Sequence, residues 1–258
     1  MKLYNLLVPN KSSVPILATI PHSGTYVPPD IKKQFKQNPA PILTNMDWHL
    51  DKLYDFLPEL GITVLQATHS RYVVDLNREV KEPLFGPNVS SVVSQDNTQG
   101  SPLYDTAPSA AEIQSRLNTY YYSYHEKLDI LLDGMVQEFG QVILFDLHSY
   151  FLRPVTDICL GNCNGNTCSE RLINTFGEAF SKQDFSIVKN EIFTGGFITR
   201  HYGTLPHVES LQIELRFPAY LEGTYFGEEE ITEWDCEKFR NAKIRLCGVF
   251  SEVISSLY

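Results

Sequence analysis

Two histidines in this chain of 258 residues stand at the ends of apolar runs, positions from which side chains often bind metals. His22 follows the run VPILATI, and His148 ends the run QVILFDLH. Glu214 lies in a third run, SLQIELR. A lone histidine after a strand is more often a structural residue. His22, His148 and Glu214 lie at three separate strand ends, and a purely structural role for all three is harder to accept, because sites of α/β sheets gather at the carboxyl ends of the strands.

A catalytic zinc needs three ligands from His, Asp or Glu and one open position. The segment MDWHLD offers a third ligand in Asp47 or His49. Residues two apart on a helix do not share a face, so only one of them is expected to point inward. We favour Asp47, and His49 is the alternative, either as the ligand or as a residue that orients it. Asp146, two residues before His148, shares its face of the strand and is expected to hold a ligand in place.

The strand around Glu214 alternates in polarity. Its apolar positions run from Leu211 to Leu215, which places Gln212, Glu214 and Arg216 together on the opposite face. A carboxylate in a covered sheet is costly unless it is paired or used. Glu214 is therefore either an ion-pair partner of Arg216 or a general base that activates a water molecule.

Arginines cluster after the second predicted strand. HSRYVVDLNRE carries Arg71 and Arg78, and GGFITRHYG adds Arg200. Guanidinium groups bind carboxylates through paired hydrogen bonds, so a pocket holding all three would suit a substrate with two carboxylates. For any single arginine, the simpler interpretation is that it neutralises Asp75 or Glu79.

Composition limits the class of protein. The chain is 43% hydrophobic and 20% charged, which is typical of a globular protein, and we expect one domain over residues 1–258. The net charge of −10 argues against nucleic acid as a partner. No apolar run approaches the roughly 20 residues that span a bilayer, and the start of the chain does not read as a signal peptide. We expect a cytoplasmic protein with no membrane partner, whose five cysteines, three of them in CLGNCNGNTC, are reduced.

Strands and helices are expected to alternate. This order predicts an α/β sandwich with a largely parallel sheet. Residues 79–109, rich in Pro, Gly, Ser and Asn, predict a long loop or a lid. The expected strands are 14–20, 62–68, 141–149 and 207–216, and the expected helices are 46–61, 110–140, 169–182 and 234–257.

Six motifs, taken in order, resemble one known family. PHSG, DWHLD, THSRYVVDLNR, FDLHS, GGFITRHYG and LQIELR, between Pro21 and Tyr220, are similar to the N-formylglutamate amidohydrolases (N-formylglutamate deformylases). That family is related to the zinc carboxypeptidases and to aspartoacylase and succinylglutamate desuccinylase. The resemblance implies a three-layer α/β/α sandwich around a mixed, mostly parallel sheet of eight strands.

The resemblance also implies roles for single residues. His22 and His148 would be zinc ligands, Asn77 and Arg78 would clamp a substrate carboxylate, and Glu214 would be the general base or acid. The wider group usually has a glutamate ligand three residues after its first histidine. Thr25 occupies that position here, so the carboxylate ligand must come from elsewhere, and Asp47 is our replacement.

The leading hypothesis is hydrolysis of N-formyl-L-glutamate to L-glutamate and formate, a step of histidine degradation in that family. Zinc, or another divalent metal, would be held by His22, Asp47 and His148, and Arg71 would help to stabilise the oxyanion. Alternatives within enzymes are an amidohydrolase for larger N-acyl groups or a carboxypeptidase-like peptidase. A metal-free dicarboxylate-binding protein is an alternative of a different class. A serine hydrolase using Ser149 is disfavoured, since DLHSY lacks the usual nucleophile elbow. The oligomeric state is not indicated.

Overall fold

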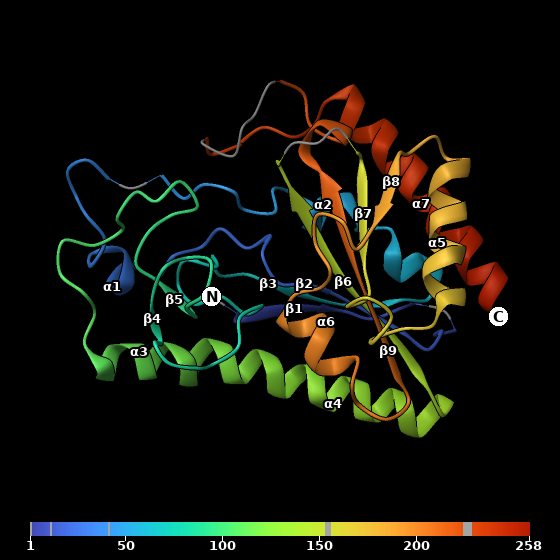
Figure 1. Cartoon of the computed structure of the whole chain (residues 1–258), viewed down its shortest axis with the longest axis horizontal. Coiled ribbons are helices and arrows are strands. Elements are labelled where there is room, and N and C mark those ends of the chain that lie inside the picture. The colour runs from blue at the N-terminus through green and yellow to red at the C-terminus, as the bar shows by residue number, and fades with distance from the viewer. Residues whose placement is uncertain (1, 11, 41, 153–155, 224–228) are drawn as a thin grey trace.

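A seven-stranded mixed sheet runs through the centre of the molecule (Figure 1). The computed structural model describes residues 2–10, 12–40, 42–152, 156–223 and 229–258. The strand order is β1-β3-β2-β6-β9-β7-β8, in which β1 is antiparallel to β3, β7 is antiparallel to β9, and the other neighbours are parallel. The strands are β1 (Tyr4–Leu7), β2 (Ile16–Ile20), β3 (Thr63–Ala67), β6 (Val142–Tyr150), β7 (Ile158–Gly161), β8 (Ile187–Lys189) and β9 (Val208–Arg216), with a separate small pair of β4 (Phe85–Gly86) and β5 (Val93–Ser94).

Helices cover both faces of the sheet, and Figure 1 shows the strands between α4 on one side and α5 with α7 on the other. On the first side, the Thr19 hydroxyl bonds to Tyr124 of α4 at 2.5 Å. On the second, the ring of Phe145 packs edge-on against Phe176 of α5 and Phe250 of α7. The predicted three-layer sandwich is confirmed. The helical segments are α1 (Pro29–Lys32), α2 (Leu50–Leu53), η1 (Leu57–Leu60), α3 (Ala110–Arg116), a π-helical turn η2 (Leu117–Tyr121), α4 (Tyr122–Phe139), α5 (Glu170–Lys182), α6 (Phe197–Tyr202), η3 (Phe217–Ala219) and α7 (Glu237–Leu257).

The long elements agree with the sequence prediction, and the short ones do not. All four predicted strands form, as do the helices near 110–140, 169–182 and 234–257. The sheet has seven strands in the described part of the chain, so the expected eight is wrong. Strands β1, β7 and β8 were not predicted, because three or four residues carry too little periodicity.

The prediction of a single helix over residues 46–61 is also wrong. Only α2 and the short helix η1 form there, because His49 adopts a left-handed conformation with φ of 59° and an α-helix starts only after it. Pro58 then lies at the start of η1, where its fixed φ suits the first turn of a helix. This break changes which way the residues of MDWHLD point, and it decides the geometry of the site.

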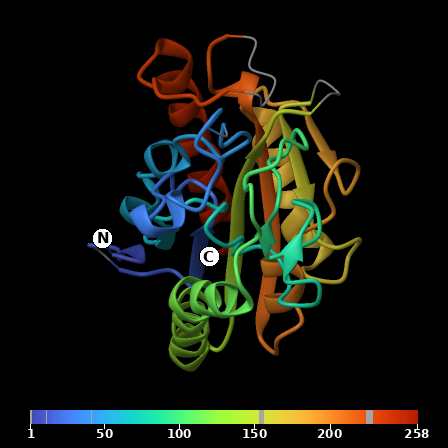
Figure 2. The same cartoon turned by 90° about the vertical axis from the view of Figure 1, so that its left-hand side faces the viewer.

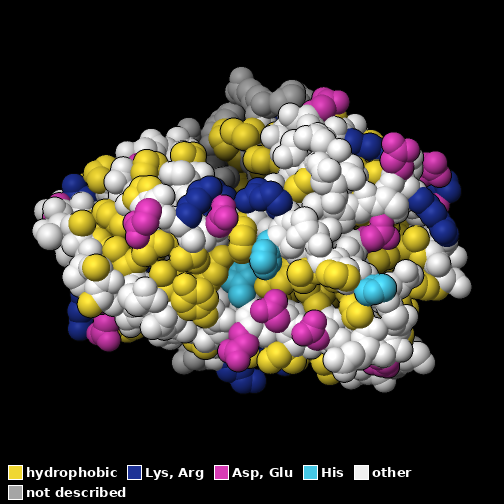
Figure 3. Space-filling view, turned by 60° about the horizontal axis from the view of Figure 1, so that its bottom comes forward, with side chains coloured by type: hydrophobic (Ala, Val, Ile, Leu, Met, Phe, Trp, Pro, Cys, Tyr) yellow, Lys and Arg dark blue, Asp and Glu magenta, His cyan; other side chains and the backbone are white. Residues whose placement is uncertain are grey.

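The molecule has mixed surface charge on the side where α3 and α4 lie. Figure 3 shows Lys and Arg side chains interspersed with Asp and Glu on this face, with histidine side chains near its centre. Figure 2 shows α4 standing out at the base of the molecule, on the far side of the sheet from α7. None of the helices in the described ranges is both long and apolar enough to cross a membrane.

Candidate active site

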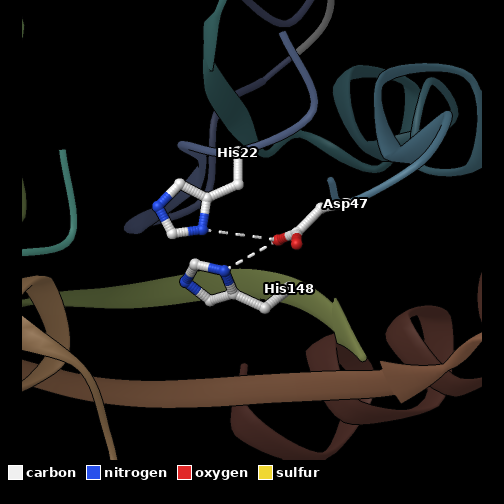
Figure 4. Close-up of side chains that lie close together, drawn as sticks. All are labelled: His22, Asp47 and His148. Carbon is white, nitrogen blue, oxygen red and sulfur yellow. Dashed lines mark hydrogen bonds and ion pairs between the residues drawn. The ribbon is translucent and has the colours of Figure 1, made fainter. Parts of the chain in front are cut away.

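His22, Asp47 and His148 converge in the interior. His22 follows the end of β2, Asp47 lies in the loop before α2, and His148 lies near the end of β6. One ligand atom from each lies within 4.8 Å of the others. Asp47 Oδ2 is 2.8 Å from Nδ1 of His148 and 3.8 Å from Nδ1 of His22 (Figure 4). The backbone N–H of Asp47 donates to the His22 carbonyl at 3.2 Å, which fastens the loop beside the strand end.

A second layer of carboxylates orients both imidazoles. Nε2 of His22 bonds to Asp75 at 2.7 Å, and Nε2 of His148 bonds to Asp146 at 2.9 Å. Each ring is thereby held so that Nδ1 faces Asp47, in the manner by which outer carboxylates fix metal-binding histidines. Two imidazole nitrogens and one carboxylate oxygen are the donors that a catalytic divalent metal takes, with a position left open. This buried group can therefore hold a metal ion.

The two histidines differ in their tendency to hold a proton. Burial lowers the pKa of His22, and the neighbouring Arg71 lowers it further, against the opposing effect of Asp75. For His148, burial also acts to lower the pKa, but Asp146 and Asp47 outweigh it and raise the pKa well above its usual value. A metal cation would replace the proton that this acidic surrounding attracts to His148.

The structure brings Asp47 to the histidines and turns His49 away from them. Nε2 of His49 bonds to the Ile231 carbonyl at 2.8 Å. His49 instead lines a separate cavity together with Trp48 and Ile231. The left-handed backbone at His49 directs its side chain away from that of Asp47.

Glu214 lies directly opposite His148 in the register between β6 and β9. Its carboxylate accepts a hydrogen bond of 2.8 Å from Gln212, two residues earlier on the same face. Arg216 instead donates to the Leu152 carbonyl, and the structure, which describes both residues, shows no ion pair between Arg216 and Glu214. Burial raises the pKa of Glu214 to about 8, opposed by His148 and reinforced by Asp47 and Asp146. A carboxyl group with a pKa near neutrality can both accept and return a proton.

Arg71 and Arg78 gather around the buried Asp75. Arg71 donates to Asp75 at 2.6 Å, and Nε of Arg78 lies 4.0 Å from the same carboxylate. Nε of Arg71 is buried and has no hydrogen-bond partner, although Arg71 lines the main cavity. The predicted ion pairing with Asp75 is present, yet both arginines keep donors for a ligand.

Asn77 lines the main cavity, whereas Arg200 does not. Asn77 Oδ1 accepts from the Ile198 N–H at 2.7 Å, and its Nδ2 donates to Asp146 at 3.3 Å and lies 2.9 Å from Nε2 of His148. Its amide is thus engaged with the protein. Arg200 lies on α6 with its side chain exposed, and the structure does not bring it to the cavity.

One cavity of about 760 Å³ joins the site residues. Part of the predicted loop over 79–109 supplies one wall, and the strand ends supply the other. Ser149 is also at this wall, but its hydroxyl is bonded to Tyr220 and not to a histidine. Besides His22, Asp47 and His148, the lining includes Arg71, Asn77, Arg78, Gln212, Glu214 and segments 87–89, 96–100, 149–152 and 192–196.

Sequence reasoning missed the structural importance of Asp75 and Gln212. The sequence predicts only that Asp75 neutralises an arginine, whereas Asp75 is fully buried and also bonds His22. The available signal was its position between apolar residues in YVVDL, where an acid needs several partners. Gln212 was assigned to the correct face without a role.

A covered α/β sheet with a buried group that can hold a metal, and a protonatable glutamate beside it, provides the parts that a metal-dependent hydrolase needs. Comparison with known proteins then identifies the family. The family described as N-formylglutamate amidohydrolase matches residues 14–221, and the chain belongs to it. The resemblance found in the six motifs is confirmed.

Individual relatives agree with this assignment. The chain is 34% identical over 230 residues to the N-formylglutamate deformylase of Pseudomonas putida, covering 83% of this chain and 85% of that protein. It is 35% identical over 224 residues to the enzyme of the same name from Pseudomonas aeruginosa, covering 82% and 84%. The crystal structure of N-formylglutamate amidohydrolase from Ralstonia eutropha JMP134 is similar with a TM-score of 0.80 at 25% identity, covering 100% of this chain and 98% of that chain.

Proposed function

We propose that this protein hydrolyses N-formyl-L-glutamate to L-glutamate and formate with the help of a divalent metal, for which zinc is our choice. The observation that carries the proposal is the buried convergence of His22, Asp47 and His148 opposite Glu214, in a member of this family. Nitrogen and carboxylate donors in a three-residue set suit zinc, and iron or manganese would accept the same ligands.

The metal would be held by Nδ1 of both histidines and a carboxylate oxygen of Asp47. When bound, it supplies Lewis acidity, which polarises a carbonyl and makes water more acidic. The chain's contribution is to present these donors in fixed orientation, through Asp75 on His22 and Asp146 on His148.

Arg71 and Arg78 would bind the carboxylates of the substrate. Both line the cavity, and the free Nε of Arg71 is a buried donor that gains a partner when a carboxylate arrives. Asp75 holds Arg71 in place and leaves its remaining N–H groups available. Because the guanidinium groups are already ordered, little side-chain entropy is lost on binding.

Glu214 would move the proton. Its carboxylate accepts a proton from the attacking water, and the resulting carboxylic acid returns it to the nitrogen that leaves as the amino group of glutamate. Gln212 holds one oxygen of Glu214, which keeps the other free for the water. Arg71, close to Asp47 and Asp75, adds positive charge where the oxyanion develops.

The test combines metal analysis with kinetics on N-formyl-L-glutamate. We expect stoichiometric metal in the wild-type protein, and loss of both metal and turnover in His148→Ala. Glu214→Gln should keep the metal and lose about 100-fold or more in kcat, which is the usual size of a general-base contribution. Glu222→Gln, an exposed acid that does not line the cavity, is the matched control. Absence of turnover by the metal-loaded wild-type protein would refute the proposal, and a metal-free protein that still binds glutamate would support a binding function instead.

A further inference from the structure

The groups of the site follow one another along the edge of the sheet. Arg71 and Arg78 lie in the segment after β3, His22 follows β2, His148 is on β6 and Glu214 is on β9. These four strands are consecutive neighbours in the sheet, about 4.8 Å apart, and β7 comes next after β9. A substrate whose carboxylates lie on the arginines, with its amide between His148 and Glu214, therefore points its acyl group toward β7.

Two aromatic side chains stand on that side. Tyr150 and Phe193 both line the cavity, and their rings pack edge to face with centroids 5.3 Å apart. Tyr150 shares a face of β6 with His148, two residues further along the strand, and its hydroxyl donates to the Thr156 carbonyl at 3.0 Å. Burial raises the pKa of Tyr150 to about 12, and the nearby Glu214 carboxylate contributes to the rise. We call Tyr150 and Phe193 the aromatic wall.

Phe193 is fixed in place by its backbone. Its N–H donates to Sγ of Cys159, and the Cys159 thiol donates to its carbonyl, both at 3.4 Å. Cys159 is buried on β7, directly opposite Glu214 in the register between β7 and β9. The next residue, Thr194, accepts from the Cys163 N–H at 2.6 Å. The wall is thus anchored to the strand next to Glu214 and cannot retreat without breaking these bonds.

We propose that the aromatic wall closes the acyl side of the site and restricts the substrate to an acyl group of about the size of formyl. The inference rests on the proposed function, since it assumes that the carboxylates bind at Arg71 and Arg78. A formyl group carries only hydrogen beyond its carbonyl carbon. An acetyl or succinyl group would extend further toward the Phe193 ring, which its contacts with Tyr150 and Cys159 hold on this side of the cavity.

The experiment compares kcat/KM for N-acetyl-L-glutamate with kcat/KM for N-formyl-L-glutamate. In Phe193→Ala, we expect the acetyl-to-formyl ratio to rise at least tenfold over the wild type, which is the discrimination that one methyl-sized group commonly carries. Phe193→Leu should give a smaller rise and keeps a large apolar side chain, so it carries the same test if the alanine variant folds poorly. Metal content should equal that of the wild type in both.

Val89→Ala is the matched control. Val89 lines the same cavity but is 81% exposed, and it follows Asn88, whose carbonyl accepts from Arg78, so it lies on the arginine side. The acetyl-to-formyl ratio of kcat/KM values for Val89→Ala should equal that of the wild type. An unchanged ratio in folded, metal-loaded Phe193→Ala or Phe193→Leu would overturn the inference while leaving the proposed function intact. A wild-type protein inactive on N-formyl-L-glutamate would overturn the proposed function itself.

Discussion

Asp75 connects the two halves of the site through a single carboxylate. It is fully buried and accepts from His22 on one side and from Arg71 on the other, with a further bond from the Asn77 N–H at 2.9 Å. Burial alone would raise its pKa, but Arg71, His22 and Arg78 hold the pKa of Asp75 well below its usual range. One ionised carboxylate therefore positions both His22, a proposed metal ligand, and Arg71, a guanidinium group proposed to bind the substrate.

Replacing the Asp75 carboxylate should weaken both metal binding and substrate binding. Asp75→Asn keeps the size of the side chain but leaves Arg71 with an uncompensated buried charge and removes the acceptor that orients His22. We expect metal affinity to fall about 10- to 100-fold, measured by competition with a chelator, and KM for N-formyl-L-glutamate to rise. Asp105→Asn is the control, because its ion pair with Lys36 is largely exposed and contributes little. Unchanged metal affinity and KM in Asp75→Asn would contradict this account.

The start of α6 is joined to the site by two side chains. The Gly196 N–H donates to Gln212 at 2.5 Å, and the Ile198 N–H donates to Asn77 at 2.7 Å. Gln212 in turn holds Glu214, and Asn77 contacts His148. Backbone groups at the start of α6 thus support both Glu214, the proposed proton-transfer residue, and His148, a proposed metal ligand.

Gly196 is where this support is most sensitive. A Cβ atom there would lie 2.6 Å from Oδ1 and 2.7 Å from Cγ of Asn77, so Gly196→Ala must displace that amide. We expect lower kcat/KM and weaker metal binding, measured on the purified variant, with a native circular dichroism spectrum.

Gly134→Ala provides the contrast for that variant. Gly134 lies in the exposed middle of α4, where an added Cβ meets nothing within 4 Å. Alanine should therefore raise the free energy of unfolding by about 0.5–1 kcal/mol, measured by urea denaturation, and leave activity unchanged. Equal kinetic effects of the two substitutions would show that Gly196 has no special role.

The stability of the folded protein should depend on a buried neutral histidine. His125 of α4 accepts from the Tyr202 hydroxyl of α6 and donates to the Leu76 carbonyl, both at 2.9 Å. Burial lowers the pKa of His125 to about 4, from an ordinary value of 6.5. Between these two values the unfolded chain binds a proton that the native protein lacks, so stability falls as pH decreases from about 6.5 to 4.

The corresponding experiment is urea denaturation as a function of pH. The contribution of His125 to the acid-dependent loss should be roughly 3 kcal/mol, because each pKa unit corresponds to about 1.4 kcal/mol. His125→Gln, though less stable near neutral pH, should lose less stability than the wild type between pH 7 and 4.5. His201→Gln, which changes an exposed histidine and keeps His125, should retain most of the wild-type loss, because burial lowers the His125 pKa more than the charge of His201 does. If His125→Gln and the wild type lost stability in parallel as pH falls, His125 would not be a source of the acid-dependent loss.

The sequence alone determined the long elements and the polar residues set within them. His148 and Glu214 could be singled out because strands buried on both faces rarely carry charge, and the period of a strand assigns each residue to a face. These are local properties, decided by a residue and its neighbours along the chain. The motif resemblance added the family.

Tertiary contacts place Asp47, and not His49, beside the two histidines, keep Arg200 away from the cavity and make Asp75 a shared partner. Each of these depends on contacts between segments far apart in the chain. The left-handed backbone at His49 keeps the residues before it out of the helix that apolar spacing favoured. No local pattern indicates that Asp75 bonds to His22, which lies 53 residues away. The side chains of the site come together through the packing of the sheet and helix layers, and this packing depends on the whole chain.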